Sequence, residues 1–197
     1  SAKEAAFKVL SKVLDATPVF SHAKFVVYVE RDPGPRSGGF PVWGSVEWGE
    51  LSLPFRAAVN ESRIHALSWS GVDPRKDAPD IEIATGEAFV GSGDLVGPGG
   101  APFDFMVKER FSARERRSIH SPPSAYIRLL ARTAIADALD VEEKRLEIVC
   151  GDRPTGRTAP VVLLDGEPTD LDVSLSHHGD QVAWAHTLRK RATSEGA

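Results

Sequence analysis

Near the C-terminus, apolar and polar residues alternate along one short stretch, and this alternation limits the possible folds more than any other feature of the sequence. Residues 171–176 read Leu-Asp-Val-Ser-Leu-Ser. A period of two is typical of a β-strand with one buried face. A polar turn that contains Gly follows at 177–180, and the run Val-Ala-Trp-Ala at 182–185 then resumes the apolar pattern. We therefore expect two strands joined by this turn.

Ser176 and His177 end the first of these strands, and Gly179 opens the backbone shortly after them. A hydroxyl and an imidazole can both donate hydrogen bonds to an anion, and Gly allows a close backbone approach. The pattern therefore fits a compact anion site or, alternatively, a polar hairpin turn with a solvated pair of histidines. A metal site built on His177 and His178 is disfavoured, because adjacent residues of a strand point to opposite faces.

Residues 1–14 predict an amphipathic helix, since their apolar residues recur at helical spacing. Glu4 and Lys8 are four residues apart, so they share one face of that helix, with the carboxylate N-terminal to the amine. Two interpretations of this pair are open. It is an ordinary surface ion pair, or Glu4 binds a divalent metal or acts as a base while Lys8 holds a phosphate.

The remaining pattern predicts an α+β protein. Runs of β-branched and aromatic residues predict strands, and Ser112 with Glu115 has the spacing of a capping box that opens a short helix. The expected strands are 23–30, 43–48, 50–57, 63–69, 146–150 and 161–164, and the expected long helix is 124–139. We expect lobes at 1–70 and 103–190, a linker or irregular segment at 71–102, and a tail at 191–197.

Composition excludes several classes of function. The chain has 197 residues, a net charge of −4 and one cysteine. A negative net charge argues against nucleic acid as a partner. A single thiol cannot form an internal disulfide, which favours a cytoplasmic protein. Cys150 ends an apolar run and is interpreted as a core residue rather than a nucleophile. No apolar stretch approaches the roughly 18 residues of a membrane span, so no membrane partner is expected.

Two motifs resemble those of the 4′-phosphopantetheinyl transferases. The run Ser-Leu-Ser-His at 174–177 is similar to a signature of that family, and Lys-Glu-Ala-Ala-Phe-Lys at 3–8 is similar to its Lys-Glu-Ala-x-x-Lys motif. In the two-lobed members, related to surfactin and enterobactin synthesis, the Ser-His strand comes first; here it comes last. The resemblance implies an α+β fold of two similar lobes, each with a helix packed on a small antiparallel sheet.

The resemblance also implies roles for the residues of these motifs. Ser176 and His177 would meet the 3′-phosphate of coenzyme A. Glu4 would be a magnesium ligand or general base, and Lys3 and Lys8 would contact phosphate or assist the reaction. The Lys-Glu-Ala helix and the Ser-His strand are then expected to face each other across a cleft between the lobes.

Further site residues follow from the same resemblance. Arg128, on the expected long helix, and Arg157, in a Gly-containing basic turn, are candidates for holding the nucleotide. The family's Gly-[Ile/Val]-Asp-x-Glu metal motif does not follow the Ser-His strand here. Asp80 and Glu82 offer the Asp-x-Glu spacing that magnesium accepts, because alternate strand residues point the same way. The chain is therefore a circular permutation, part of a longer protein, or a divergent relative with a changed metal site.

These observations predict a cytoplasmic enzyme that transfers the 4′-phosphopantetheine group of coenzyme A to a serine of an acyl or peptidyl carrier protein, with Mg²⁺ as cofactor. Such carrier proteins serve fatty acid, polyketide or nonribosomal peptide biosynthesis. Two alternatives remain. The chain is an inactive or partial relative that binds coenzyme A or a carrier protein without transfer, or it is an unrelated α+β domain in which both motifs are accidental.

Overall fold

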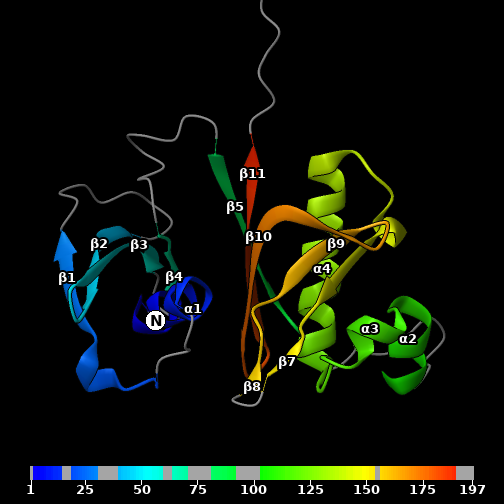
Figure 1. The fold of residues 1–197 in the computed structure, drawn as a ribbon, viewed down its shortest axis with the longest axis horizontal. Coiled ribbons are helices and arrows are strands. Elements are labelled where there is room, and N and C mark those ends of the chain that lie inside the picture. The colour runs from blue at the N-terminus through cyan, green and yellow to red at the C-terminus, as the bar shows by residue number, and fades with distance from the viewer. Residues whose placement is uncertain are drawn as a thin grey trace, which may run out of the picture. The chain divides into compact units, whose positions relative to one another are not determined.

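A computed structural model of the chain describes residues 2–14, 19–30, 40–59, 64–70, 81–91, 103–153 and 156–189. The chain divides into two compact units, Ser1–Ala78 and Pro79–Ala197 (Figure 1). Every strand pairing in the described residues is antiparallel. Helices pack against antiparallel sheets rather than alternating with parallel strands, so the protein belongs to the α+β class.

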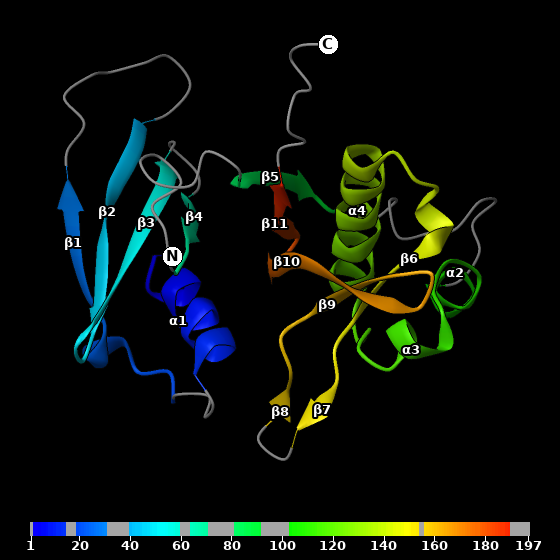
Figure 2. The same cartoon turned by 45° about the horizontal axis from the view of Figure 1, so that its top comes forward.

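The first unit combines one helix with a four-stranded meander. Its elements are α1 (Ala2–Val13), the 3-10 turn η1 (His22–Lys24), β1 (Val26–Glu30), β2 (Phe40–Trp48), β3 (Leu51–Val59) and β4 (Ile64–Ser68). The strands lie in the order β1-β2-β3-β4, and α1 lies against one face of the sheet (Figure 2). A turn at 49–50 joins β2 to β3, and Gly49 has a φ of 60°, which a tight hairpin turn requires.

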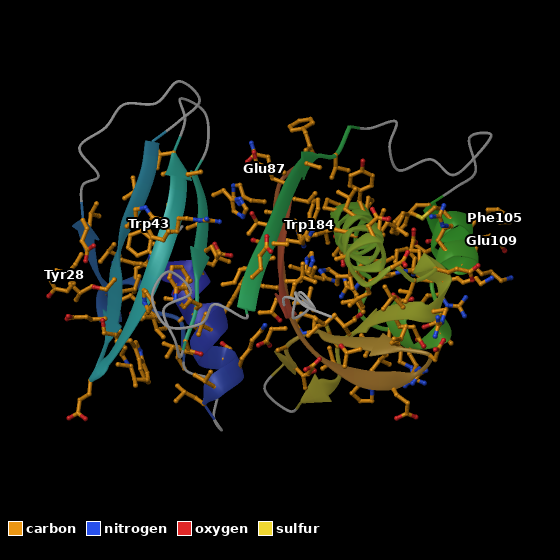
Figure 3. All side chains as sticks on the ribbon, turned by 90° about the horizontal axis from the view of Figure 1, so that it is seen from above. Tyr28, Trp43, Glu87, Phe105, Glu109 and Trp184 are labelled. Carbon is orange, nitrogen blue, oxygen red and sulfur yellow. The ribbon has the colours of Figure 1, made fainter. Side chains whose placement is uncertain are left out.

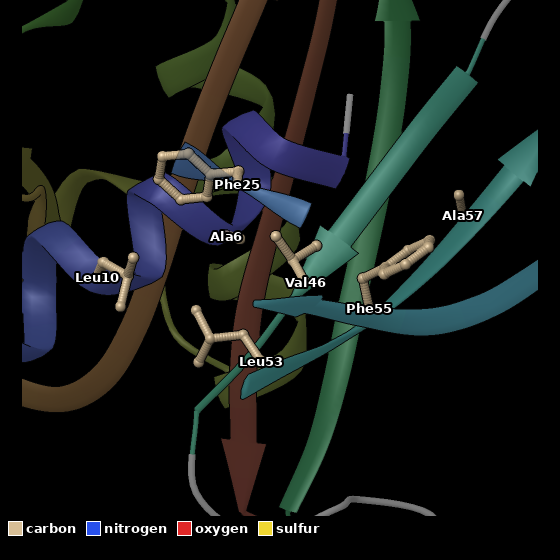
Figure 4. Packing of buried hydrophobic residues seen from close by; sticks show 7 residues of the cluster. All are labelled: Ala6, Leu10, Phe25, Val46, Leu53, Phe55 and Ala57. Atoms are coloured by element: carbon tan, nitrogen blue, oxygen red, sulfur yellow. The ribbon is translucent and has the colours of Figure 1, made fainter. Parts of the chain in front are cut away.

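The core of the first unit lies between α1 and the sheet. Ala6 and Leu10 are one helical turn apart and are both fully buried. They pack against side chains that alternate along β2 and β3 and point to the helix (Figure 4). The buried cluster contains Ala6, Leu10, Phe25, Val46, Leu53, Phe55 and Ala57. α1 thereby uses one face for the core and leaves Glu4 on its exposed side.

The second unit is built on a five-stranded sheet with the strand order β5-β11-β10-β9-β6 (Figure 1). These strands are β5 (Ile81–Phe89), β6 (Leu146–Val149), β9 (Val161–Leu164), β10 (Glu167–His178) and β11 (Gln181–Arg189), and a separate hairpin consists of β7 (Asp152–Arg153) and β8 (Gly156–Arg157). The helices are α2 (Phe103–Arg110), α3 (Ala113–Arg116) and α4 (Pro122–Leu139), with a 3-10 turn η2 (Glu143–Arg145). β10 is the central strand of the sheet.

α4 covers one face of this sheet (Figure 2). Ser121 caps the helix by accepting a hydrogen bond from the Ser124 amide, and prolines occupy the first two helical positions. The helix ends at Asp140, which adopts the left-handed conformation with a φ of 57°. Its buried face packs on residues of β6, β9 and β10; this cluster contains Ala131, Ile135, Ala136, Leu146, Ile148, Val162 and Val173.

A buried ion pair ties α3 to α4 and β6. The side chains of Arg132 and Glu115 are 6% and 1% exposed, and their closest nitrogen and oxygen are 3.3 Å apart. Glu115 also accepts the backbone N–H of Ile148 at 3.0 Å and completes the predicted capping box with Ser112. Arg132 donates to the Arg110 carbonyl at 3.0 Å. These bonds fix a helix of only four residues, which local propensity alone could not hold.

Most of the strands expected from the sequence are confirmed, as are α1, α4 and the capping box. The linker or irregular segment expected at 71–102 is wrong in part, because 81–89 form β5 and pair with β11 along their whole length. α2 was also not anticipated, since it follows a Gly- and Pro-rich run that indicates irregular structure. The finer expectation of two similar lobes of the transferase type stays a prediction. None of the helices in the described part of the chain is long and apolar enough to cross a membrane.

Candidate anion-binding site

The predicted Ser-His strand is β10, and the candidate residues lie where it leaves the core. Val173 is fully buried, Leu175 packs against the clusters beneath α4, and His177 is exposed. These three residues alternate along the strand and therefore share the face that α4 covers. Ser176 pairs with Ala183 of β11 and belongs to the opposite face. The hydroxyl and the imidazole thus lie next to each other in sequence but point to different sides of the sheet.

The position of His177 along α4 follows from its neighbour on β11. His177 pairs with Val182, which is buried in a cluster with Ile127 from the second turn of α4. Tyr126 and Leu130 of α4 pack against the same cluster. His177 therefore lies on the face of the sheet that carries the N-terminal half of α4.

A second histidine lies beside His177. The rings of His120 and His177 have centroids 6.2 Å apart and planes inclined at 50°. His120 lies between α3 and α4, directly before the cap residue Ser121, and its side chain is exposed. Sequence reasoning missed His120 because nothing in the local pattern links it to His177, which follows more than fifty residues later. The ring of His177 thus lies near another imidazole.

Arg128 occupies a different environment from the one expected. Its side chain is buried, with 5% of the residue exposed. Nη1 donates to the carbonyl and hydroxyl oxygens of Ser124, each at 2.8 Å, and Nη2 donates to Ser118 Oγ at 3.0 Å. The thiol of Cys150 lies 3.6 Å from Nη2. A phosphate could reach this guanidinium only by displacing one of these protein contacts.

Arg157, the other candidate for nucleotide binding, lies in β8, and its side chain is outside the described residues. The hairpin of β7 and β8 is closed at its base by two bonds between Gly151 and Thr158. The Gly151 amide donates to Thr158 Oγ1 at 2.7 Å, and the Thr158 amide donates to the Gly151 carbonyl at 2.9 Å. The predicted basic turn is therefore a hairpin that extends from the strand ends of β6 and β9 (Figure 2).

The Lys-Glu-Ala residues lie on α1 in the first unit. Glu4 and Lys8 form the predicted pair, with 3.8 Å between Lys8 Nζ and Glu4 Oε1, and their side chains are 52% and 31% exposed. Burial of its stem lowers the pKa of Lys8, while the Glu4 carboxylate acts in the opposite direction and Lys12 reinforces the lowering. Lys3 points elsewhere, since its Nζ donates to the His22 carbonyl at 2.7 Å. Glu4 and Lys8 together offer an exposed carboxylate beside an ammonium group.

Of the metal ligands expected from the sequence, the structure describes Glu4 and Glu82, which belong to different units. Glu82 lies on β5 with an exposed side chain, and Asp80 lies outside the described residues. Glu4 belongs to the other unit. Among the described residues, no group of three histidine, cysteine, aspartate or glutamate side chains could hold a metal ion. The prediction that the Lys-Glu-Ala helix faces the Ser-His strand stays a prediction.

No protein-family model, curated protein or solved structure matches this chain. The functional assignment therefore depends on the two sequence motifs and on the geometry of the residues that carry them.

Proposed function

We propose that this protein transfers the 4′-phosphopantetheine group of coenzyme A to a serine hydroxyl of an acyl or peptidyl carrier protein. The observation that carries the proposal is the exposed imidazole of His177 at the end of β10, inside the Ser-Leu-Ser-His run. The Glu4–Lys8 pair, inside the Lys-Glu-Ala run of α1, supports it independently.

The reaction requires a base, a cation near the transferring phosphate and a site for the nucleotide end of coenzyme A. The serine oxygen forms a bond to the phosphorus that bears pantetheine, and the bond from that phosphorus to adenosine 3′,5′-bisphosphate breaks. The leaving group keeps the electron pair, and the serine proton passes to a base. In the proposed assignment Glu4 accepts this proton, Lys8 stabilises charge on the transferring phosphate, and His177 binds the 3′-phosphate.

Three residues expected at the site have other surroundings than the resemblance implies. Ser176 lies on the opposite face of β10 from His177, so a shared contact of both side chains with one phosphate is left out of the proposal. Arg128 is given no direct contact with the nucleotide, because its guanidinium is buried among protein partners. Lys3 is assigned to holding α1 through the His22 carbonyl rather than to the phosphate.

Mg²⁺ is the expected cofactor, because a divalent cation neutralises pyrophosphate during such a transfer. Of the expected ligands, the described residues contain Glu4 on α1 of the first unit and Glu82 on β5 of the second. Magnesium commonly takes one or two protein carboxylates together with substrate phosphates. Since a single carboxylate does not define a complete site, no step of the mechanism is assigned to the metal.

The second candidate function is binding of coenzyme A or a carrier protein without transfer. The absence of a Gly-[Ile/Val]-Asp-x-Glu motif after the Ser-His strand favours this alternative, because transfer requires the metal ion and binding alone does not. The two functions differ in one observable, the mass of the carrier protein. A binder leaves that mass unchanged while still retaining coenzyme A.

The test is mass spectrometry of an apo carrier protein incubated with this chain, coenzyme A and Mg²⁺. We expect a gain of one phosphopantetheine group, abolished by Glu4→Gln. The matched control is Glu50→Gln, which alters an exposed carboxylate of the same unit in the turn between β2 and β3. An unchanged carrier protein together with measurable coenzyme A binding would replace the transferase by the binding function. Equal transfer by both variants would remove Glu4 from the mechanism.

A further inference from the structure

We propose that His120 is the second phosphate-binding group of this site and works together with His177, and that Arg128 is a positioning residue that holds His120 in place through Ser118. This inference rests on the proposed function, since it names the group that recognises the 3′-phosphate of coenzyme A. It differs from the sequence-based expectation, which paired His177 with Ser176 and gave Arg128 a direct contact.

The first argument is that the two imidazoles share a face and lie within reach of one ligand group. Their ring centroids are 6.2 Å apart, and both side chains are exposed. A phosphate oxygen accepts hydrogen bonds at about 2.7–2.9 Å from charged nitrogen donors, so one phosphate can contact two rings at this separation. Ser176 cannot take this role, because it points to the other side of β10.

The second argument is that the position of His120 is fixed by the protein. Its Nδ1 lies 3.2 Å from the Ser118 carbonyl oxygen. A carbonyl only accepts hydrogen bonds, so Nδ1 carries a hydrogen in this contact, and a ligand contact would use Nε2. In a neutral ring Nε2 would then be an acceptor, so its hydrogen bond to a phosphate oxygen requires the imidazolium form of His120. Ser118 is itself buried, and its hydroxyl bonds the Glu115 carbonyl at 2.9 Å and receives Arg128 Nη2 at 3.0 Å. The guanidinium of Arg128 thus restrains the loop that presents His120.

The third argument concerns the start of α4, which lies directly after His120. A helix N-terminus normally attracts anions through its unpaired amides and its dipole. Here Pro122 and Pro123 have no N–H to offer, and the amides of Ser124 and Ala125 both bond to Ser121. The dipole still favours negative charge near this end, but the hydrogen-bond donors must come from side chains. Among the described residues, His120 directly precedes the cap residue and His177 lies beside it, so two imidazoles are near this end of α4.

The ligand group that fits two imidazoles near a helix N-terminus is a phosphate monoester. Coenzyme A carries one at its 3′ position, and adenosine 3′,5′-bisphosphate carries the same group in a small and soluble form. Adenosine 5′-monophosphate lacks it and retains the rest of the nucleotide. The ratio of the affinities for adenosine 3′,5′-bisphosphate and adenosine 5′-monophosphate therefore measures recognition of the 3′-phosphate alone.

The experiment is isothermal titration calorimetry of the full chain with these two nucleotides. We expect the wild type to prefer the bisphosphate, and His120→Gln to reduce that preference about tenfold, as for loss of one hydrogen bond to a charged group. His177→Gln should have a similar effect, and the double variant should lose little more than either single one, because both groups bind the same phosphate. His178→Gln is the control, since His178 is exposed on the opposite face of the same strand.

The positioning role of Arg128 has its own readout. Ser118→Ala removes the hydroxyl that receives Arg128 Nη2 but leaves the charge of the arginine unchanged. We expect this variant to shift the NMR signals of the His120 ring in the absence of ligand and to lower the preference for the bisphosphate, with affinity for adenosine 5′-monophosphate unaltered. Unaltered His120 signals and an unaltered preference would remove Arg128 and Ser118 from the site.

The outcomes separate this inference from the proposed function. A wild-type preference that survives His120→Gln overturns the role of His120 and leaves the transferase intact. A preference that depends on both histidines, together with no transfer to a carrier protein, supports the phosphate site and overturns the transferase. An absence of preference in the wild type overturns the inference, whatever the transfer assay shows.

Discussion

The indole ring of Trp184 lies directly over the backbone of Gly86 on the neighbouring strand. The two residues are paired between β11 and β5, and a Cβ atom built on Gly86 would lie 2.1 Å from Trp184 Cζ2 (Figure 3 labels Trp184). Real Cβ atoms do not approach carbon this closely, so only glycine fits beneath the ring. The ring can then pack against Leu175 and the helix-covered core of the second unit.

Gly86→Ala should therefore destabilise the second unit. In the interior of a strand, alanine is normally more favourable than glycine. A destabilising effect of Gly86→Ala would therefore be caused by the clash with Trp184 and not by strand propensity. We expect a loss of about 1–3 kcal/mol in the free energy of unfolding, typical of overpacking a core. Urea denaturation monitored by tryptophan fluorescence measures this change. Thr85→Ala, at the exposed neighbour on β5, is the control, and equal midpoints for both variants would contradict the prediction.

Arg132→Met should destabilise the second unit more strongly. The substitution leaves the Glu115 carboxylate, which is 1% exposed, without its buried cation. Removing one partner of a buried pair typically costs about 3–5 kcal/mol, measurable by urea denaturation. Adding Glu115→Gln to Arg132→Met should restore part of this loss, since the orphaned charge disappears. Arg145→Met breaks an exposed pair with Asp165 and should have a much smaller effect.

The stability of the protein should fall as the pH drops below about 6.5 because of His186. His186 is 3% exposed, and burial lowers its pKa below the ordinary value of 6.5. The folded state therefore keeps this ring neutral at a pH where the unfolded state already binds a proton. The unfolded state then holds more protons, so the free energy of unfolding decreases with falling pH, by at most about 1.4 kcal/mol per pH unit for one group.

His186→Leu provides the comparison for this effect. Leucine has no group to protonate, so the variant should lose less stability than the wild type between pH 7.5 and pH 5.5, as measured by urea denaturation at each pH. Neither ring nitrogen of His186 has a hydrogen-bond partner within the described residues, so the substitution sacrifices no such bond there. Parallel pH profiles for the two proteins would show that other groups cause the acid sensitivity.

Glu4→Gln and Lys8→Met should separate function from stability on α1. Both side chains are partly or mostly exposed, and pairs of this kind stabilise a helix by only about 0.2–0.5 kcal/mol. Thermal unfolding should therefore change little in either variant. Loss of a general base commonly costs about 10²–10⁴-fold in rate, so transfer to a carrier protein should fall at least 100-fold for Glu4→Gln. If the melting temperature falls strongly and transfer activity falls only in proportion to the loss of folded protein, the two residues have a structural role instead.

Those parts of the fold could be predicted in which a local sequence pattern is compatible with only one local backbone structure. The capping box at Ser112 and Glu115, the paired prolines at the start of α4 and the alternation along β10 each determine their own backbone. β5 was missed because the Pro, Gly and Lys residues around it indicate a linker. The reason for Gly86 lies in Trp184, nearly a hundred residues further along the chain, and no local pattern contains that information.

The same limit applies to the candidate site. The exposure of His177 follows from its place after the apolar part of β10, and the sequence predicted it. The contact with His120 depends on how α4 lies across the sheet, and the burial of Arg128 depends on Ser118 and Ser124 around it. Both are tertiary relationships. A motif match identifies the residue types at a site but does not determine which face of a strand each one takes.

The strand order of the second sheet also determines which N-terminal truncations of this protein leave the second unit intact. β5 is an outer strand of that sheet but precedes all three of the unit's helices in the chain. A fragment that starts at residue 103 would retain the whole helical layer and both histidines, yet it would uncover the edge of β11 and one face of the Trp184 ring. Unpaired strand edges of this kind promote self-association. The shortest soluble piece that keeps the proposed phosphate site should therefore begin before Ile81.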